Sequence, residues 1–318
     1  MQTVPFSCQV LSISILASVA AIAADDVDVV DLRQAVIVAG DDGTVIRTAQ
    51  RMLTEEVAQR TGITLRSSAT SAGATTATIL LCRVDRAPAH VREFVEAMNV
   101  PEHAEGFAIA IDSSGTAPNI VLAGREERGV LFAAGRLLLR LRMNSNQLEL
   151  PAEYRIATAP RYPHRGHQIG FRNLSHCYDA WTAETYEQYM RELAVFGANA
   201  FETTSFSDPD LRDGPHAKLT RGEMASAWCR ICADYGFSFW LFSHAVGGEG
   251  GSDEEQLEAI ESQLKMIRAI PHLDHIYLTG GDGGSRHRRP DLMFEWTGRF
   301  AEEARKIYPD LGVWVSNQ

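Results

Sequence analysis

The stretch that decides the fold runs from Tyr162 to Glu202 and reads YPHRGHQIGFRNLSHCYDAWTAETYEQYMRELAVFGANAFE. Its first apolar run, Gly166–Phe171, is predicted to form a short buried strand, and its last, Ala198–Glu202, a second one. Between them lie a long polar loop and an amphipathic helix, predicted over Ala183–Phe196. A strand, a helix and a second strand in this order predict the opening βα unit of a parallel barrel.

The same alternation continues along the chain beyond Glu202. Further helices are predicted at Arg221–Tyr235, Asp253–Ile270 and Pro290–Tyr308, and further strands at Phe237–Ser243, His275–Thr279 and Gly312–Ser316. Two helix starts carry a capping box, Thr220 with Glu223 and Ser252 with Glu255. The long loops follow the carboxyl ends of strands, where barrels of the TIM type gather their functional groups.

The number of units is smaller than a closed barrel requires. Four βα units and a fifth strand are predicted after the linker, whereas a closed eight-stranded barrel needs about 250 residues. We therefore expect residues 162–318 to form the first half of a (β/α)8 barrel, either as an open sheet or as part of a longer protein. The unpaired last strand is expected to favour association.

Residues 26–155 are predicted to form a separate α/β sandwich domain. Its strands are expected at Gln34–Gly40, Thr76–Val84, Phe107–Asp112 and Asn119–Ala123. One helix is predicted over Val45–Gln59 and a second over 124–142, where apolar side chains recur with helical spacing. These two helices are expected to cover one face of a mixed sheet, and the prolines at 151, 160 and 163 mark the linker to the barrel.

Composition and charge exclude some classes of partner. The 318 residues are 45% hydrophobic and 22% charged, with a net charge of −11, which is ordinary for a globular protein. The excess of acidic over basic residues argues against nucleic acid and anionic membranes as partners, since both favour a basic protein surface. A neutral carbohydrate or other small molecule remains compatible with this charge.

The first 24 residues are predicted to be a secretory signal peptide. They contain no charged residue, and their apolar core runs from Val10 to Ala24. Ala21-Ile22-Ala23 provides a small-x-small cleavage pattern, although the usual Lys or Arg near Met1 is absent. We expect export, to the periplasm or the outside of the cell.

Cysteine and histidine spacing does not predict a metal site. Cys229 and Cys232 lie within a helical pattern and are expected to be small buried side chains. The alternative is that they form a redox pair or half of a zinc site. His164 and His167 stand at a strand entry, where their spacing directs them to opposite faces. No cofactor is expected.

The layout of the whole chain resembles secreted glycoside hydrolases of the β-N-acetylhexosaminidase and α-glucuronidase type, families 20 and 67. The residues that carry the resemblance are Gly124–Leu138, the strand start at Arg165-Gly166 and the segment Phe196–Glu202. The resemblance implies a hexosaminidase-like N-terminal domain followed by a catalytic (β/α)8 barrel, which is truncated in this chain.

The resemblance also implies roles for two residues. Arg172 stands where family 20 enzymes place an arginine that binds sugar hydroxyls. In Thr279–Gly284 (TGGDGG), Asp282 matches the aspartate that orients the acetamido group of the substrate. Gly283 stands where the family has the glutamate that acts as general acid, and glycine cannot protonate a leaving group.

The residues themselves suggest a pair of carboxylates, as glycoside hydrolysis requires. Asp282 and Glu202, both predicted near strand ends, are the candidates for catalysis; the alternatives are a turn-forming role for Asp282 and a structural role for Glu202. His244 follows the third barrel strand and is a candidate for binding sugar or tuning a carboxylate, or else an ordinary loop histidine.

The loop after the first barrel strand offers the remaining substrate-binding candidates. Tyr178 and Trp181 have flat faces on which a sugar ring can stack, although Trp181 beside a helix start is also suited to packing. Asp179 is a further candidate, and an ion pair with Arg172 is the competing interpretation. Together these residues predict hydrolysis of glycosidic bonds in extracellular poly- or oligosaccharides. The alternative is a non-catalytic carbohydrate-binding protein or an inactive barrel fragment.

Overall fold

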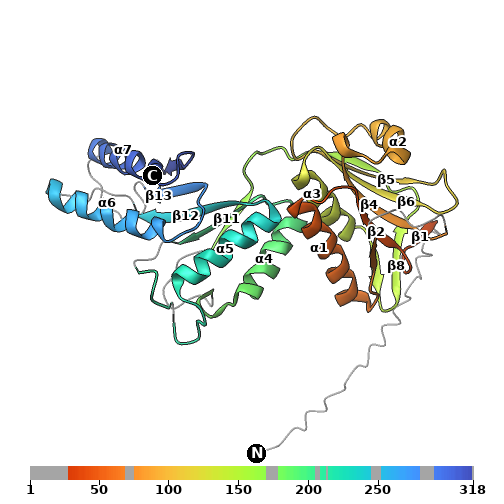
Figure 1. Ribbon diagram of the computed structural model, residues 1–318, viewed down its shortest axis with the longest axis horizontal. Coiled ribbons are helices and arrows are strands. Elements are labelled where there is room, and N and C mark those ends of the chain that lie inside the picture. The colour runs from red at the N-terminus through yellow and green to blue at the C-terminus, as the bar shows by residue number, and fades with distance from the viewer. Residues whose placement is uncertain are drawn as a thin grey trace, which may run out of the picture.

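The computed structural model describes residues 28–68, 75–169, 178–204, 208–212, 214–244, 252–279 and 290–316, without the side chains of Asp179, His244, Pro290 and Leu292. Within these ranges the strands form three sheets, of six, three and five strands (Figure 1). The predicted signal peptide lies outside the described residues. Among those that are described, no helix has the length and apolarity needed to cross a membrane.

The six-stranded sheet forms the centre of the N-terminal part. Its strands follow the order β3-β2-β4-β6-β5-β9, and β5 runs antiparallel to both of its neighbours. Their bounds are β2 Val36–Ala39, β3 Arg66–Ser68, β4 Thr78–Arg83, β5 Phe107–Asp112, β6 Asn119–Gly124 and β9 Ile156–Thr158. A small antiparallel sheet lies beside it, made of β1 Val29–Asp31, β8 Gln147–Pro151 and β7 Arg142–Asn144.

Both faces of the six-stranded sheet are covered. The helices α1 (Thr44–Thr61) and α3 (Glu127–Leu138) pack on one face, as predicted. The other face carries two short 3-10 turns, η1 (Val84–Arg86) and η2 (Ala89–Val91), and the helix α2 (Arg92–Ala97), which the sequence did not reveal. Six residues are too few for a helical repeat to be recognised.

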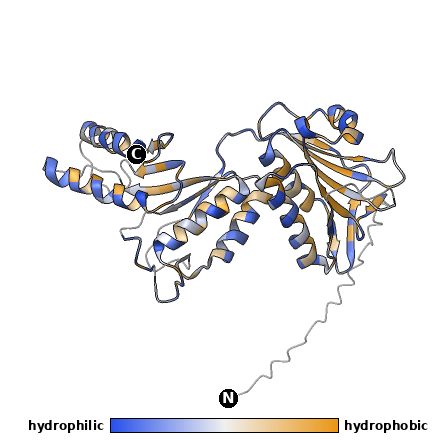
Figure 2. Cartoon of the chain, in the orientation of Figure 1, coloured by the Kyte–Doolittle hydropathy of each residue, from blue (hydrophilic) through white to orange (hydrophobic). Residues whose placement is uncertain are grey.

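Strand side chains alternate between these two faces. Ile37, Ile79 and Leu81 are buried beneath α1 and α3, and Val38 and Leu80 are buried beneath α2. The strands of this sheet are therefore hydrophobic on both sides, whereas the helices alternate hydrophobic and hydrophilic residues (Figure 2).

The C-terminal part is a five-stranded sheet in which every strand is parallel to its neighbours and follows chain order. Its strands are β10 Gly166–Gln168, β11 Ala200–Thr204, β12 Ser238–His244, β13 His275–Thr279 and β14 Gly312–Val315. The connections contain η3 Tyr178–Ala180, α4 Ala183–Val195, α5 Arg221–Tyr235, α6 Asp253–Arg268 and α7 Pro290–Arg305. This arrangement confirms the predicted α/β class with the first half of a (β/α)8 barrel.

Local predictions in this part are mostly confirmed. Both capping boxes are formed, at Thr220 and Ser252, and each helix begins where its box predicts. Cys229 and Cys232 are buried, and both thiols are free. The prediction for β11 was wrong by two residues at each end. The strand was predicted over Ala198–Glu202, whereas it begins at Ala200 and ends at Thr204.

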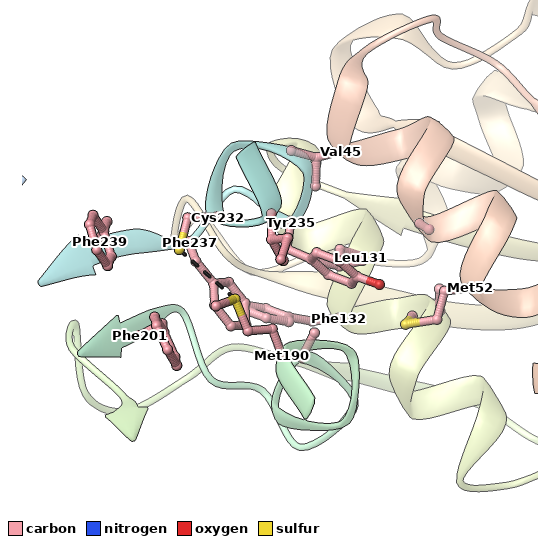
Figure 3. Close-up of a cluster of buried hydrophobic side chains, with 14 of the residues drawn as sticks. Val45, Met52, Leu131, Phe132, Met190, Phe201, Cys232, Tyr235, Phe237 and Phe239 are labelled. Atoms are coloured by element: carbon pink, nitrogen blue, oxygen red, sulfur yellow. Dashed lines mark hydrogen bonds between the residues drawn. The ribbon is translucent and has the colours of Figure 1, made fainter. Parts of the chain in front are cut away.

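The two parts share one continuous core. Figure 3 shows Met190 and Tyr235 of the barrel part beside Leu131 and Phe132 of α3, and Val45 of α1 close by. The helices α1 and α3 pack against α5 and α4 respectively. The N-terminal part therefore supports the helices that cover the first barrel strands.

Candidate functional site

The candidate site is the edge of the five-stranded sheet at which its strands end. The register places Thr204 beside Phe242, and His244 beside Thr279. In parallel barrels this carboxyl edge carries the loops that bind and react with substrate. His244 is thus the last residue of β12 and lies at this edge, as the sequence predicts.

Two of the predicted residues follow this edge directly in the chain. Asp282 comes three residues after Thr279, and Arg172 comes four residues after Gln168. Both lie outside the described residues, so their roles stay predictions. The hydroxyl of Thr279 is buried and has no hydrogen-bond partner among the residues that the structure describes.

Glu202 lies on the inner face of the sheet, below the edge. It is two residues before the end of β11 and is level with Gln168, Trp240 and His275 of the neighbouring strands. Two residues separate Glu202 from Thr204 at the end of β11, which corresponds to about 7 Å of strand. Glu202 therefore belongs to the interior layer of the barrel and not to its rim.

The surroundings of Glu202 favour the protonated carboxyl. Burial raises the pKa of Glu202 above its ordinary value, and the hydrogen bond from Gln168 Nε2 to Glu202 Oε1, 2.8 Å long, opposes part of this rise. A carboxyl with a raised pKa keeps its proton to higher pH than an ordinary glutamate and is therefore better suited to donate it. A raised pKa is also found in buried carboxyls with a structural role, so it does not by itself assign a role to Glu202.

Tyr178, Asp179 and Trp181 lie together at the start of α4. The Trp181 ring makes edge contacts with Tyr178 at 4.8 Å and with Tyr186 at 5.2 Å between ring centroids. The Tyr186 hydroxyl donates a hydrogen bond to the Tyr178 carbonyl over 3.1 Å. Trp181 thus packs against Tyr178 and against Tyr186 of α4, and Asp179 has a described position only for its backbone.

An aromatic cluster on the inner face was not anticipated from the sequence. It consists of His164, Trp240, His275 and Trp314, with ring centroids between 4.2 and 6.0 Å apart. The Trp314 indole donates a hydrogen bond to His275 Nδ1 over 3.1 Å. The alternation of side chains in β12 and β13 was the signal that could have indicated it.

The two histidines at the strand entry point to opposite sides, as predicted. His164 belongs to the inner cluster, whereas His167 lies against Tyr189 of α4 on the outer side. Within the described part of the chain, no group of three or more histidine, cysteine, aspartate or glutamate side chains is placed to hold a metal ion.

Solved structures share the combination of a mixed sheet covered on both faces and a parallel barrel sheet. CpGH84B superimposes with a TM-score of 0.60 at 16% identity. The GH20 β-N-acetylhexosaminidase from Streptomyces coelicolor A3(2) gives 0.61 at 13% identity, and the GH20 exo-β-N-acetylglucosaminidase from Vibrio harveyi gives 0.57 at 14%. The fold is that of glycoside hydrolase structures.

The superposition covers most of this chain but only part of each counterpart. It includes 90% of this chain and 47% of CpGH84B, 63% of the Streptomyces enzyme and 51% of the Vibrio enzyme. The chain therefore spans about half to three fifths of the length of these structures. No family model matches the chain, and no curated protein sequence matches it.

The superposition on the GH20 structures confirms the likeness to hexosaminidases at the level of the fold, in both parts of the chain. At 13–16% identity a shared fold carries no assignment of catalytic residues. The likeness to family 67 and the roles of individual residues stay predictions.

Proposed function

We propose that this chain is an exported glycoside-hydrolase-like protein that acts on glycosidic bonds in extracellular poly- or oligosaccharides. The observation that carries the proposal is the five-stranded parallel sheet, which superimposes on GH20 and GH84 structures and whose carboxyl edge leads into the predicted site loops. Domains at 26–155 and 162–318, after a leader at 1–24, are part of this proposal. A carbohydrate is the proposed partner.

Asp282 is proposed as the principal catalytic carboxylate. It follows β13 at the edge where barrel enzymes place their reacting groups, and its sequence neighbours match the family 20 motif as far as the aspartate. Arg172 and His244 are proposed to bind sugar hydroxyls at the same edge. Tyr178, Asp179 and Trp181 are proposed to border the substrate beside β10.

Glu202 is proposed as the second carboxyl because Gly283 cannot supply a proton. Its raised pKa supports a role as proton donor, since a carboxyl that keeps its proton to higher pH than an ordinary glutamate is better suited to transfer it to a leaving group. Its place in the interior layer weighs against direct contact with substrate.

The test measures release of a fluorescent alcohol from aryl β-N-acetylglucosaminides by the full chain and by single variants. Asp282→Asn is expected to lower kcat/KM at least a hundredfold, which is the scale of losing a positioned catalytic group. Asp310→Asn removes an exposed carboxylate before β14 and serves as the matched control, with no change expected. Equal turnover by Asp282→Asn and the native chain would reject the assignment.

A second candidate function is carbohydrate binding without hydrolysis. The glycine at position 283 and the interior position of Glu202 both favour it, because neither provides an acid at the edge of the sheet. In that case the native chain binds a chito-oligosaccharide in a titration while releasing no reducing sugar. Saturable binding that Arg172→Ala abolishes, together with no turnover, would establish this function instead.

A further inference from the structure

A buried carboxylate joins the N-terminal part to the entry of the barrel sheet. Glu105 lies in the turn between α2 and β5, and its side chain is only 3% exposed. This turn is fixed from within the N-terminal part, because the Gly106 amide donates to the His103 carbonyl over 2.7 Å and the Arg125 amide donates to the Gly106 carbonyl over 2.9 Å. The carboxylate of Glu105 is therefore held at a defined place beside the barrel.

Two barrel side chains donate hydrogen bonds to this carboxylate, and a guanidinium of α3 pairs with it. Asn199 Nδ2 donates to Oε1 over 2.9 Å, and Arg165 Nη2 donates to Oε2 over 2.6 Å. Arg128 Nε lies 3.1 Å from Oε1. Arg165 directly precedes β10, and Asn199 directly precedes β11. One carboxylate of the N-terminal part thus binds the entries of two neighbouring barrel strands.

Asn199 and Arg165 also link the two strand entries to each other. Asn199 Oδ1 accepts the backbone amide of Arg165 over 2.9 Å, and Asn199 Nδ2 donates to the Pro163 carbonyl over 2.7 Å. Arg165 Nε donates to the Gly197 carbonyl, again over 2.7 Å. Glu105 accepts a hydrogen bond from each of the two side chains that make these contacts, and so keeps both in the orientation that the contacts require.

The hydrophobic pattern of β10 does little to fix its register on β11. The strand is three residues long, begins with Gly166, and is exposed at all three positions. Within residues 161–169 only the side chain of Ile169 is buried. Register is weakly specified in a strand that contains glycine and has no buried face of its own. The polar contacts of Arg165 and Asn199 therefore supply what the hydrophobic pattern lacks.

The same register decides the surroundings of Glu202. Arg165 bonds to Asn199 across 34 positions of sequence, and Gln168 bonds to Glu202 across the same 34, so one register serves both pairs. A slip of β10 by one residue would turn the Gln168 side chain to the opposite face of the sheet. The 2.8 Å hydrogen bond from Gln168 to Glu202 would then be lost. The surroundings of this carboxyl thus depend on contacts made at the strand entries.

We propose that Glu105 is a positioning residue for Glu202. Through Arg165 and Asn199 it fixes the register of β10 on β11, and this register keeps Gln168 bonded to Glu202. The N-terminal part thereby contributes to the site without lining it. The consequence for turnover rests on the proposed function, in which Glu202 is the proton donor, whereas the consequence for the geometry of β10 does not.

The test is hydrogen–deuterium exchange of the full chain without substrate, read by mass spectrometry of its peptides. Glu105→Gln keeps the size of the side chain but replaces one acceptor oxygen by a donor, which faces the donors of Arg165 and Asn199. Exchange over 165–169 is expected to become at least roughly tenfold faster, a difference of about 1.4 kcal/mol, while α5 and β4 keep native rates. Equal acceleration in all three segments would show a general structural role and overturn the proposal. Native exchange over 165–169 in the folded variant would overturn it as well.

Glu102→Gln is the matched control. Glu102 lies three residues earlier in the same segment and pairs with Arg125, but its side chain is 90% exposed. Its replacement is expected to leave exchange over 165–169 at the native rate. Should Glu105→Gln fail to fold by circular dichroism, Arg165→Lys takes its place, because lysine keeps the charge but loses the planar fork that reaches Glu105 and Gly197 together. Native exchange over 165–169 in Arg165→Lys would also overturn the proposal.

The side-chain amide of Gln168 provides a direct reading of its bond to Glu202. Its signal in a 15N–1H NMR spectrum is identified by its absence from Gln168→Leu. We expect this signal to move in Glu105→Gln and to keep its native position in Glu102→Gln. An unmoved signal in folded Glu105→Gln would overturn the proposal. Neither measurement uses a substrate, so a native chain without turnover would reject the proposed function and leave this test intact.

Discussion

The guanidinium of Arg191 on α4 lies 3.4 Å from the carboxylate of Glu56 on α1, and the two side chains are only 6% and 3% exposed. Arg191 also contacts Glu55 and Glu187, and its Nε donates to the Tyr235 hydroxyl over 3.1 Å. This group of charges joins the first barrel helix to the N-terminal part. Loss of Arg191 leaves the buried carboxylate of Glu56 with the half-exposed Arg60 as its ionic partner. Removing the buried partner of such a carboxylate is costly.

Replacing Arg191 by Met is therefore expected to lower the free energy of unfolding by about 3 kcal/mol. The measurement is urea denaturation followed by circular dichroism. Arg51→Met is the control, since Arg51 pairs with Glu187 but is more exposed, and its loss should change stability by about 1 kcal/mol or less. Adding Glu56→Gln to Arg191→Met should recover part of the loss. Equal stability of the two single variants would contradict the importance assigned to the buried pair.

The contact between α3 and α4 depends on the absence of a side chain at Gly135. A Cβ at this position would lie 2.8 Å from the Cα of Val195. Gly135→Ala is expected to destabilise the protein by about 1–3 kcal/mol, because backbone atoms must move apart. Thermal unfolding of the purified variant measures this effect.

Gly298→Ala is the matched control for Gly135→Ala. Gly298 lies inside α7, where an added Cβ meets no atom within 4 Å. Alanine is there expected to stabilise the helix by about 0.5–1 kcal/mol. Opposite signs for the two substitutions are thus predicted, and stabilisation by both would show that α3 and α4 do not pack as described.

The raised pKa of Glu202 predicts a pH-dependent cost of its ionisation. The native state holds this proton above pH 4.5, the ordinary value, whereas the unfolded chain has released it. Stability is therefore lost as pH rises through the folded pKa. Glu202→Gln removes this cost, so the variant should gain stability relative to the native chain as the pH rises above 4.5.

Denaturation with guanidinium chloride at several pH values measures the difference. Glu261→Gln is the control, and its stability relative to the native chain should fall as the pH rises. The reason is that the hydrogen bond from Arg268 lowers the pKa of the exposed Glu261. A Glu202→Gln variant whose stability relative to the native chain does not rise with pH would contradict the interior placement of this carboxyl.

His275 is expected to make the inner aromatic cluster sensitive to acid. Burial lowers the pKa of His275 below 6.5, and the nearby His164 acts in the same direction, while Asp274 opposes it. The indole of Trp314 donates to Nδ1 of His275, which requires that nitrogen to be unprotonated. The unfolded chain thus binds the proton more readily, and stability is lost as pH falls from 6.5 through the folded pKa.

His275→Gln should reduce this slope of stability against pH between 7.5 and 5. Tryptophan fluorescence during unfolding provides the measurement, since Trp240 and Trp314 both belong to the cluster. His90→Gln, at an exposed site in η2, should keep the native slope. An unchanged slope in His275→Gln would show that this histidine does not contribute.

Much of the secondary structure of this chain is predictable because its signals are local. The capping boxes at Thr220 and Ser252 each involve residues three positions apart, and both form as expected. The candidate site is less predictable. Glu202 was placed at a strand end because β11 was expected to stop there, but the strand continues to Thr204 and puts this carboxyl in the interior layer.

The sequence by itself determined the order of strands and helices in the barrel part, the parallel arrangement of those strands and the likeness to hexosaminidases. Hydrophobic spacing and caps act over a few residues and can be read along the chain. Only the tertiary structure decided that Glu202 lies beside Gln168 and that Arg191 meets Glu56. These arrangements depend on strand register and on helix packing between residues distant in sequence, and no local pattern specifies either of them.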